Sequence, residues 1–471
     1  MIKQQHMKRI LLLLFVIIPA FTFAQPTLKL PNILSDHAVF QASSSVKLWG
    51  WGHSTVPVKI VCSWNPSDTI TTMPKKDWTW ETTVKTPKAG GPYTISFSSG
   101  KKQITIHDIL TGEVWLCSGQ SNMEFNYNWG SIDSVDVKKT ANREIRFFQP
   151  SHSYADYPQG NTEGEWKVCD AASMPNFSLV GYFFGRKLNT QLHKPIGLIG
   201  SYWGGSCVQA WTPKEAYKGN SQLWQEAEDL PAVSWSPVAP TVIYNAMIHP
   251  ILNYKIAGTI WYQGEQNTDR PQYYGDLFKA MITSWRKEFR NDFPFYFVQI
   301  APWSGYGGLS GAIVREQQAS ALSLPKTGMV TVGDLVDDVT NIHPKSKKPV
   351  GDRLANLALK EVYGFDKLEP YQPQFASMNI KGNKALITVK SIGKLTVKGK
   401  AIESFQVAGS DQHFYPAQAK LKKDGTIEVF SKKVKHPVAV RYCFTNGGMP
   451  NLFDTNGLPL EPFRTDNWKV K

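Results

Sequence analysis

The sequence lacks several features that would point to particular classes of protein. Its 471 residues include only five cysteines, which are widely spaced and form no C-x-x-C pair. This spacing excludes a recognisable zinc or disulfide framework, and the odd number leaves at least one cysteine unpaired. No apolar run beyond the N-terminal leader approaches the length of a transmembrane helix. We find no internal repeat or low-complexity tract, so a repeat architecture is not indicated.

Charge is sparse and gives little information about partners. Charged residues make up 19% of the chain and hydrophobic residues 42%, as in ordinary folded proteins with room for two or three domains. The formal net charge of +14 fits an acidic substrate, but it fits a requirement for solubility equally well. Lysine and arginine are scattered, and no nucleic-acid motif accompanies them. The sequence therefore predicts no nucleic-acid partner.

The N-terminus has the pattern of a secretory signal peptide. Lys3, Lys8 and Arg9 precede an apolar run at residues 10–23, and Ala24 provides a small residue for cleavage. The run is too short to span a bilayer comfortably. We expect export to the periplasm or the extracellular space, cleavage after Ala24, and no stable membrane insertion afterwards. An uncleaved membrane anchor is the alternative.

Three regions of different pattern follow the signal peptide. Residues 25–108 contain short β-branched and aromatic runs separated by turns, which predicts a small antiparallel sandwich. Its tryptophans at 49, 51, 78 and 80 fit a core better than a sugar-binding platform. Residues 109–365 alternate buried strands with helices, which predicts an α/β domain with a parallel sheet and helices on both faces. Residues 366–471 form a second β-rich region.

The central region begins with a serine at a strand-to-helix corner. The apolar residues 114–117 suit a buried strand, and the Ser-Gly-Gln-Ser-Asn at 118–122 has turn and helix-cap chemistry. Such a corner presents Ser121 at the carboxyl edge of the sheet, where helix N–H groups meet developing negative charge. Alternatively, Ser118 and Ser121 merely cap a helix.

Several motifs together carry a resemblance to a known family. Gly-Gln-Ser-Asn-Met at 119–123 resembles the first motif of the sialate O-acetylesterase branch of the SGNH hydrolases. Trp-Tyr-Gln-Gly-Glu at 261–265 and Ile-His-Pro-Lys at 342–345 are similar to later motifs of this family, and the resemblance spans nearly the whole mature chain. It implies a flavodoxin-like SGNH fold and an exported serine esterase that removes acetyl groups from sugar hydroxyls. O-acetylated sialic acid is the implied substrate, as a small molecule or glycan, with no metal or organic cofactor.

The resemblance also assigns roles to residues. It makes Ser121 the nucleophile and His343 the general base that takes the serine proton. The oxyanion hole would be formed by the N–H groups of Ser121 and Gly205 and by an amide side chain. Gln263 is the first choice for this amide and Asn267 the second, because the usual asparagine position is occupied by Gln266.

The third member of the triad is where the sequence departs from the family pattern. Thr340 occupies the position of the usual aspartate, and Asn341 stands where relatives often carry one. Either a nearby aspartate folds back to the histidine ring, or Asn341 or a backbone carbonyl holds it and the pair works as a dyad. The candidate aspartates are Asp334, Asp337 and Asp338.

Further residues are candidates for substrate binding. The carboxylate of sialic acid could be held in bidentate fashion by Arg270 or Arg315. Gln120 and Glu265 lie within the motifs, and Glu265 suits the orientation of neighbouring hydrogen bonds. Two rival functions stay open: an esterase for acetylated polysaccharide such as xylan, and a non-catalytic glycan-binding protein.

Overall fold

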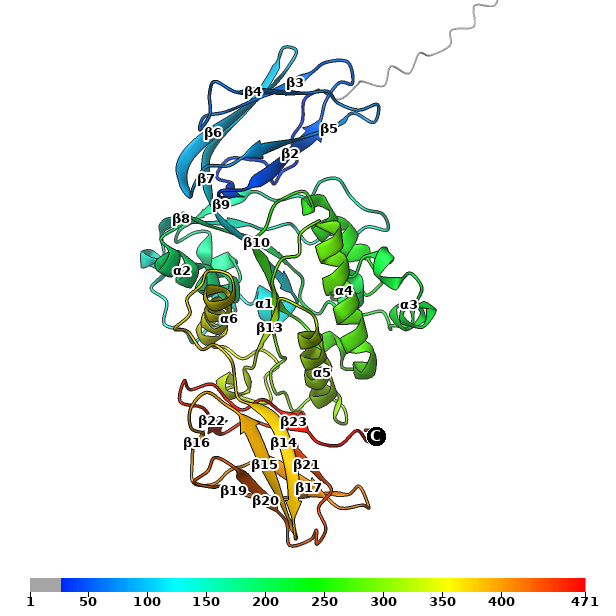
Figure 1. Cartoon of the computed structure of the whole chain (residues 1–471). Coiled ribbons are helices and arrows are strands. Elements are labelled where there is room, and N and C mark those ends of the chain that lie inside the picture. Colours follow the sequence, from blue (N-terminus) through cyan, green and yellow to red (C-terminus); the bar gives the residue numbers. More distant parts are fainter. Residues whose placement is uncertain (1–26, 471) are drawn as a thin grey trace, which may run out of the picture.

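The computed structural model describes residues 27–470, so the expected signal peptide at 1–24 lies outside the described residues. Three parts are stacked along the molecule (Figure 1): a β region at the N-terminal end, a central α/β part, and a second β region at the C-terminal end. The fold class expected from the sequence is confirmed, with a central parallel sheet covered by helices and flanked by β structure.

The N-terminal β region is joined to the central part by one long strand. Its strands are β1 (Val39–Gln41), β2 (Ser45–Trp51), β3 (Val58–Cys62), β4 (Thr69–Thr72), β5 (Thr79–Lys85), β6 (Gly90–Ser99) and β7 (Lys102–Gly119). The first part of β7 pairs antiparallel with β6, and residues 113–119 pair in parallel with the central strands. At the change, Asp108 has a left-handed φ of 52°. The domain boundary expected between 108 and 109 therefore falls inside a single strand.

The central sheet has the order β13-β12-β11-β7-β10-β8-β9. Neighbouring strands are parallel except for the edge strand β9. The remaining central strands are β8 (Asn142–Phe148), β9 (Trp166–Cys169), β10 (Ile196–Tyr202), β11 (Gly258–Tyr262), β12 (Phe295–Val298) and β13 (Thr327–Val330). Strands β8 and β9 were not expected from the sequence, since both carry charged residues among the apolar ones.

Helices cover both faces of this sheet because its strands are apolar on both sides. Side chains of β7 alternate: Trp115 and Cys117 pack in the cluster that includes α2 and α6, whereas Leu116 packs in the cluster that includes α4. Figure 1 shows α2 and α6 on one side and α4 and α5 on the other. The helices are α1 (Ser121–Glu124), α2 (Leu179–Leu192), α3 (Ser221–Glu228), α4 (Tyr274–Glu288), α5 (Ser310–Ala319) and α6 (Lys348–Glu361), with a π-helical turn at Tyr244–Ile248.

The C-terminal β region has its own apolar core. Its core residues include Ile387, Val407, Val429 and Val440, which form a cluster separate from those of the central part. Its strands are β14 (Gln374–Lys381), β15 (Lys384–Lys390), β16 (Thr396–Val397), β17 (Phe405–Ala408), β18 (Phe414–Pro416), β19 (Gln418–Leu421), β20 (Ile427–Phe430), β21 (Ala439–Tyr442), β22 (Leu452–Phe453) and β23 (Phe463–Arg464). Within residues 27–470, no helix has the length and apolar character needed to cross a membrane.

Candidate active site

Ser121 stands where the central strand β7 ends and the short helix α1 begins. The preceding Gly119 has a φ of +137°, and a Cβ added there would lie 2.2 Å from the carbonyl oxygen of Tyr262. Only glycine therefore allows the chain to pass so close to β11. The N–H of Gln120 donates to the same carbonyl at 2.9 Å, which fixes the corner that presents the serine.

His343 reaches this corner from the loop between β13 and α6. Its Nε2 lies 2.8 Å from Oγ of Ser121, a hydrogen-bonding distance for proton transfer. Burial lowers the pKa of the His343 imidazole, and the nearby ammonium of Lys347 lowers it further. Both effects favour the neutral ring, which is the form that can accept the serine proton.

The four candidates for the third member do not hydrogen-bond to the His343 ring. Asn341 accepts from the backbone N–H of His343 at 2.9 Å. Asp338 accepts from the backbone and hydroxyl of Thr340, and Asp334 forms a two-pronged ion pair with Arg353 at 2.7 and 2.8 Å. Asp337 is exposed to solvent. Within residues 27–470, no hydrogen bond is formed by Nδ1 of His343, so the arrangement is that of a Ser-His pair.

A buried side-chain network behind the pair joins the nucleophile to the histidine loop. The amide of Asn122, the residue after Ser121, donates to Oε1 of Glu265 at 2.6 Å and to the carbonyl of Ile342 at 3.1 Å. Its oxygen accepts from Nζ of Lys347 at 2.6 Å. Asn122 and Lys347 are fully buried and Glu265 is nearly so. This network holds Asn122, which follows Ser121, against Ile342, which precedes His343.

The charges in this network are strongly affected by their burial. Burial lowers the pKa of Lys347 to about 7, although the carboxylates of Glu265, Asp133 and Asp337 act in the opposite direction. The ammonium also lies over the Phe125 ring, 4.7 Å from its centroid, which supplies a cation–π interaction. Burial raises the pKa of Glu265, and its second oxygen has no hydrogen-bond partner in the described part of the chain.

Asn122 and Lys347 were not identified from the sequence as site residues. Asn122 lies inside the Gly-Gln-Ser-Asn-Met motif and Lys347 lies four residues after His343, so their nearness to the two principal residues was a usable signal. A buried lysine is rare in a folded protein, but the sequence does not show which lysine is buried.

The glycine pair after β10 lies directly beside the serine. A Cβ added at Gly204 would lie 3.4 Å from Cβ of Ser121, and the Gly204 N–H donates to Oε2 of Glu124 at 2.6 Å. Gly205 has a left-handed φ of +72°. In residues 27–470 the N–H groups of Gly205 and Ser121 have no hydrogen-bond acceptor, so both are available to an oxyanion.

The two amides expected to complete the oxyanion hole are engaged elsewhere. Nε2 of Gln263 donates to the carbonyl of Ser206 at 3.1 Å and to Oδ1 of Asn267 at 2.7 Å. Nδ2 of Asn267 donates to Oε1 of Gln209 at 2.8 Å. The expectation that one of them points at the oxyanion is not met, because both hold the loop that carries Gly205.

The other candidate substrate residues also have partners within the protein. Gln120 is buried and accepts from the backbone N–H groups of Gly264 and Gln266. Arg270 pairs with Glu226 at 2.5 Å. Arg315 is buried and donates to the carbonyl of Thr445 in the C-terminal region. The contact of Arg270 with Glu226 therefore competes with a substrate carboxylate, and burial separates Arg315 from solvent although its Nε and Nη1 have no partner in the described residues. Glu265 lies behind the Ser-His pair rather than facing solvent.

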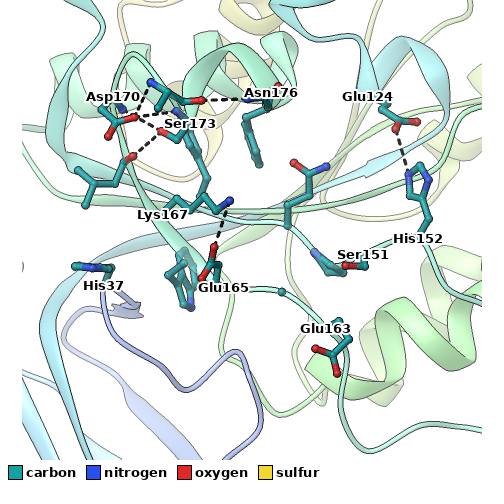
Figure 2. Close-up of a pocket in the computed structure, with 18 residues that line it drawn as sticks. His37, Glu124, Ser151, His152, Glu163, Glu165, Lys167, Asp170, Ser173 and Asn176 are labelled. Atoms are coloured by element: carbon teal, nitrogen blue, oxygen red, sulfur yellow. Dashed lines mark hydrogen bonds and ion pairs between the residues drawn. The ribbon is translucent and has the colours of Figure 1, made fainter.

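A large cleft of about 1120 Å³ opens beside the serine corner. Figure 2 shows Glu124 and His152 at one side of it, with Lys167, Glu165 and Asp170 farther along. Glu124 contacts Nε2 of His152 at 3.1 Å, and neither Ser121 nor His343 lines the cleft. The cleft therefore adjoins the catalytic pair without containing it.

Comparisons with known proteins agree with this geometry. The family model described as "Carbohydrate esterase, sialic acid-specific acetylesterase" matches residues 111–360. The sialate O-acetylesterases of Rattus norvegicus and Homo sapiens are 27% and 25% identical to the chain, over 86% and 92% of its length and 86% and 91% of theirs. The crystal structure of a carbohydrate acetylesterase from Xanthomonas citri matches with a TM-score of 0.85 and 34% identity, covering 93% of this chain and all of that one.

Proposed function

The chain belongs to the sialic acid-specific acetylesterase family of carbohydrate esterases, and we propose that it deacetylates O-acetylated sialic acids through an acetyl-Ser121 intermediate. As a member of this family it is a carboxylic ester hydrolase that removes acetyl groups from sugars. The observation that carries the proposed mechanism is the 2.8 Å contact between Oγ of Ser121 and Nε2 of His343.

In the proposed acylation step, Ser121 attacks the acetyl carbonyl while His343 takes the hydroxyl proton. The N–H groups of Ser121 and Gly205 donate to the oxyanion of the tetrahedral intermediate. The intermediate collapses when the bond to the sugar oxygen breaks, and His343 returns the proton to that oxygen. Water then attacks the acetyl-enzyme by the same route and releases acetate.

The choice of sialic acid rests on the family description and on the names of the relatives. A second substrate class, acetyl esters of neutral polysaccharide such as xylan, is favoured by one observation. Arg270 is ion-paired with Glu226, and Arg315 is buried and donates to the carbonyl of Thr445, so a sialic acid carboxylate would have to displace Glu226 from the first or enter the interior to reach the second. The same two-step chemistry serves either substrate.

Acetate release from O-acetylated sialic acids and from acetylated xylan, measured side by side, tests the proposal. We expect Ser121→Ala and His343→Ala to abolish release from the preferred substrate. Ser118→Ala is a matched control, because Ser118 is a buried strand residue whose hydroxyl has no partner in the described part of the chain. Release from xylan alone would keep the mechanism and replace the substrate, whereas full activity of Ser121→Ala would refute the mechanism.

We also propose that the protein is exported and cleaved after Ala24, on the basis of the basic and apolar N-terminal pattern. The test is the N-terminal sequence of protein recovered from the periplasm or the medium. A first residue of Gln25 is the expected result, and an intact N-terminus retained in the membrane would contradict it.

A further inference from the structure

The exposed aromatic side chains of the central part gather on the segments that follow three strands near the nucleophile. Four large aromatic residues of the central part are strongly exposed, and all follow the carboxyl ends of β7, β8 or β10: Trp129 at 45%, Tyr154 at 65%, Tyr157 at 78% and Trp235 at 60%. Exposed apolar side chains concentrated near a site indicate an interaction surface.

Trp235 has the most direct connection to the catalytic serine. A Cβ added at Gly205 would lie 2.2 Å from Cδ1 and 2.5 Å from Nε1 of the Trp235 indole, so the ring lies against the bare Cα of this glycine. The neighbouring Gly204 would place a Cβ 3.4 Å from Cβ of Ser121. The indole therefore lies next to the backbone N–H that the proposed mechanism uses for the oxyanion.

The segment that carries Trp235 is tied to the glycine loop. Sγ of Cys207 contacts the carbonyl of Val238 at 3.5 Å, and the N–H of Thr241 donates to the carbonyl of Gln209 at 3.0 Å. Because residues 238–241 run along residues 207–209, the backbone holds the indole in place while much of its surface stays open to solvent. A large apolar surface that is held in place and uncovered is suited to a ligand.

A second aromatic surface is linked to Gly204. The ring of Trp203 stacks on His152, with ring centroids 4.6 Å apart and planes inclined by 5°. His152 contacts Glu124, and Glu124 accepts the Gly204 N–H, so this stack is also tied to the serine corner. Aromatic surfaces linked to the glycine pair suit a ring-shaped ligand with an apolar face and polar edges.

We propose that Trp235 is the platform on which the pyranose ring of the acetylated sugar stacks while its acetyl group reaches Ser121. This inference rests on the proposed function and adds the residue that distinguishes a sugar ester from any other acetyl ester. The C–H face of the sugar covers the open indole, and its hydroxyls stay hydrogen-bonded at the edge. Trp235 is then a specificity residue that leaves the acyl chemistry itself untouched.

The test compares Trp235→Ala on two substrates. One is the O-acetylated sugar that wild type prefers, and the other is glycerol triacetate, which has no ring to stack. Loss of the stacking contact should weaken binding of the sugar ester, so we expect its kcat/KM to fall about tenfold or more, mainly through a higher KM. A tenfold loss corresponds to about 1.4 kcal/mol of binding free energy. For glycerol triacetate we expect a change within about threefold. Trp235→Phe keeps a ring and is expected to recover most of the loss.

Trp78→Ala is the control. Trp78 was expected in the core from the sequence but is an exposed tryptophan of the N-terminal β region, so its loss is expected to leave activity on both substrates unaffected. An equal loss on both substrates after Trp235→Ala would overturn the platform, because it would show that the ring only supports the Gly205 backbone. Unchanged kinetics on both would also overturn it.

A binding measurement separates this inference from the proposed function. In the Ser121→Ala background, calorimetry with the acetylated sugar reports binding without turnover. Weaker binding after an added Trp235→Ala supports the platform even if wild type releases no acetate. Equal binding with and without the indole refutes the platform even if the esterase activity is established.

Discussion

The loop that carries the nucleophile and the loop that carries the base are held in place by different means. Backbone hydrogen bonds to neighbouring strands fix residues 119–123: Gln120 donates to Tyr262, and Trp203 donates to the carbonyl of Gly119 at 3.0 Å. Side chains fix residues 341–347 instead. Asn341 accepts from the N–H and Asn122 donates to the carbonyl of the peptide that joins Ile342 to His343, and Asp133 accepts the N–H of Lys347 at 2.6 Å.

This difference indicates how a Ser-His pair can be held in place without a carboxylate on the histidine ring. A backbone-held nucleophile tolerates many side-chain changes, because its position depends on the sheet. The position of His343, in contrast, depends on each side chain that bonds to its loop. The loop that carries His343 therefore has several hydrogen bonds to its own backbone where a triad would have one strong contact to the ring. The ammonium of the buried Lys347 favours a neutral imidazole.

The largest expected effect tests whether the two loops act as one catalytic unit. Ser121→Ala and His343→Ala should each lower kcat by about 10⁴-fold or more, and the double variant should be no worse than either, as in residues that work as a unit. Single-turnover acetate release measures this. Additive losses would show that the two side chains contribute separately.

Asn122→Ala removes the side chain that joins the two loops. We expect kcat to fall about a hundredfold, because a small displacement of a positioned group has this cost. The variant should also be less stable by about 1–3 kcal/mol, since it leaves buried hydrogen-bonding groups of Glu265, Ile342 and Lys347 without a partner. Kinetics and denaturant unfolding measure the two effects. Asn126→Ala on the same segment but outside the network is the control, and an equal kcat loss in both would contradict the role of Asn122.

Lys347→Met tests how the charge of the Lys347 ammonium affects the pKa of His343. The Lys347 ammonium and, more strongly, burial lower the pKa of His343, so removing the ammonium should raise this pKa while leaving the effect of burial. The acid limb of kcat/KM, which reports protonation of the free base, should move to higher pH. The raised pKa of Glu265 lets this carboxyl take up a proton when its counter-charge is removed.

The matched control for this pH profile is Lys345→Met, since Lys345 is exposed on the same loop and solvent screens its charge. A lower activity with an unmoved acid limb in Lys347→Met would show a structural role alone. Because the pKa of Lys347 is about 7, the difference from wild type should be largest below neutral pH, where the ammonium is charged.

The smallest expected effect concerns the aspartates that the sequence offered as the third member. Asp338→Asn should change kcat by less than about twofold, because its carboxylate is exposed and bonds only to Thr340. Initial rates measured over a range of substrate concentrations give kcat for the variant and for wild type. A loss approaching about ten-thousandfold would instead identify Asp338 as the acid of a triad.

Much of the fold could be predicted from local patterns. The alternation of buried strands and helices expected over residues 109–365 is present, and the strand expected at 114–117 forms the last part of β7. The apolar residues of these strands and helices recur at the period of the element, which is a property of near neighbours. The continuous strand β7 was missed because Asp108 interrupts its apolar pattern, although a left-handed residue there lets the strand bend and continue.

The candidate site was predicted in part. Ser121 and His343 are brought together and Gly204, the neighbour of Gly205, lies beside Ser121, whereas Gln263, Asn267, Arg270 and Arg315 bond within the protein. Residue type and position in a motif indicate that an amide or a guanidinium is near the site. They do not indicate whether its hydrogen bonds are already used, because each partner comes from another part of the chain.

The sequence alone determined the alternation of strands and helices, the corner that presents Ser121, and membership of the esterase family. Only the tertiary structure decided what holds His343 and which lysine is buried beside it. The three bonds of Asn122 in this network join residues 143, 220 and 225 positions apart in the chain. Their energy depends on exclusion of water by the packed core, and no local pattern contains that information.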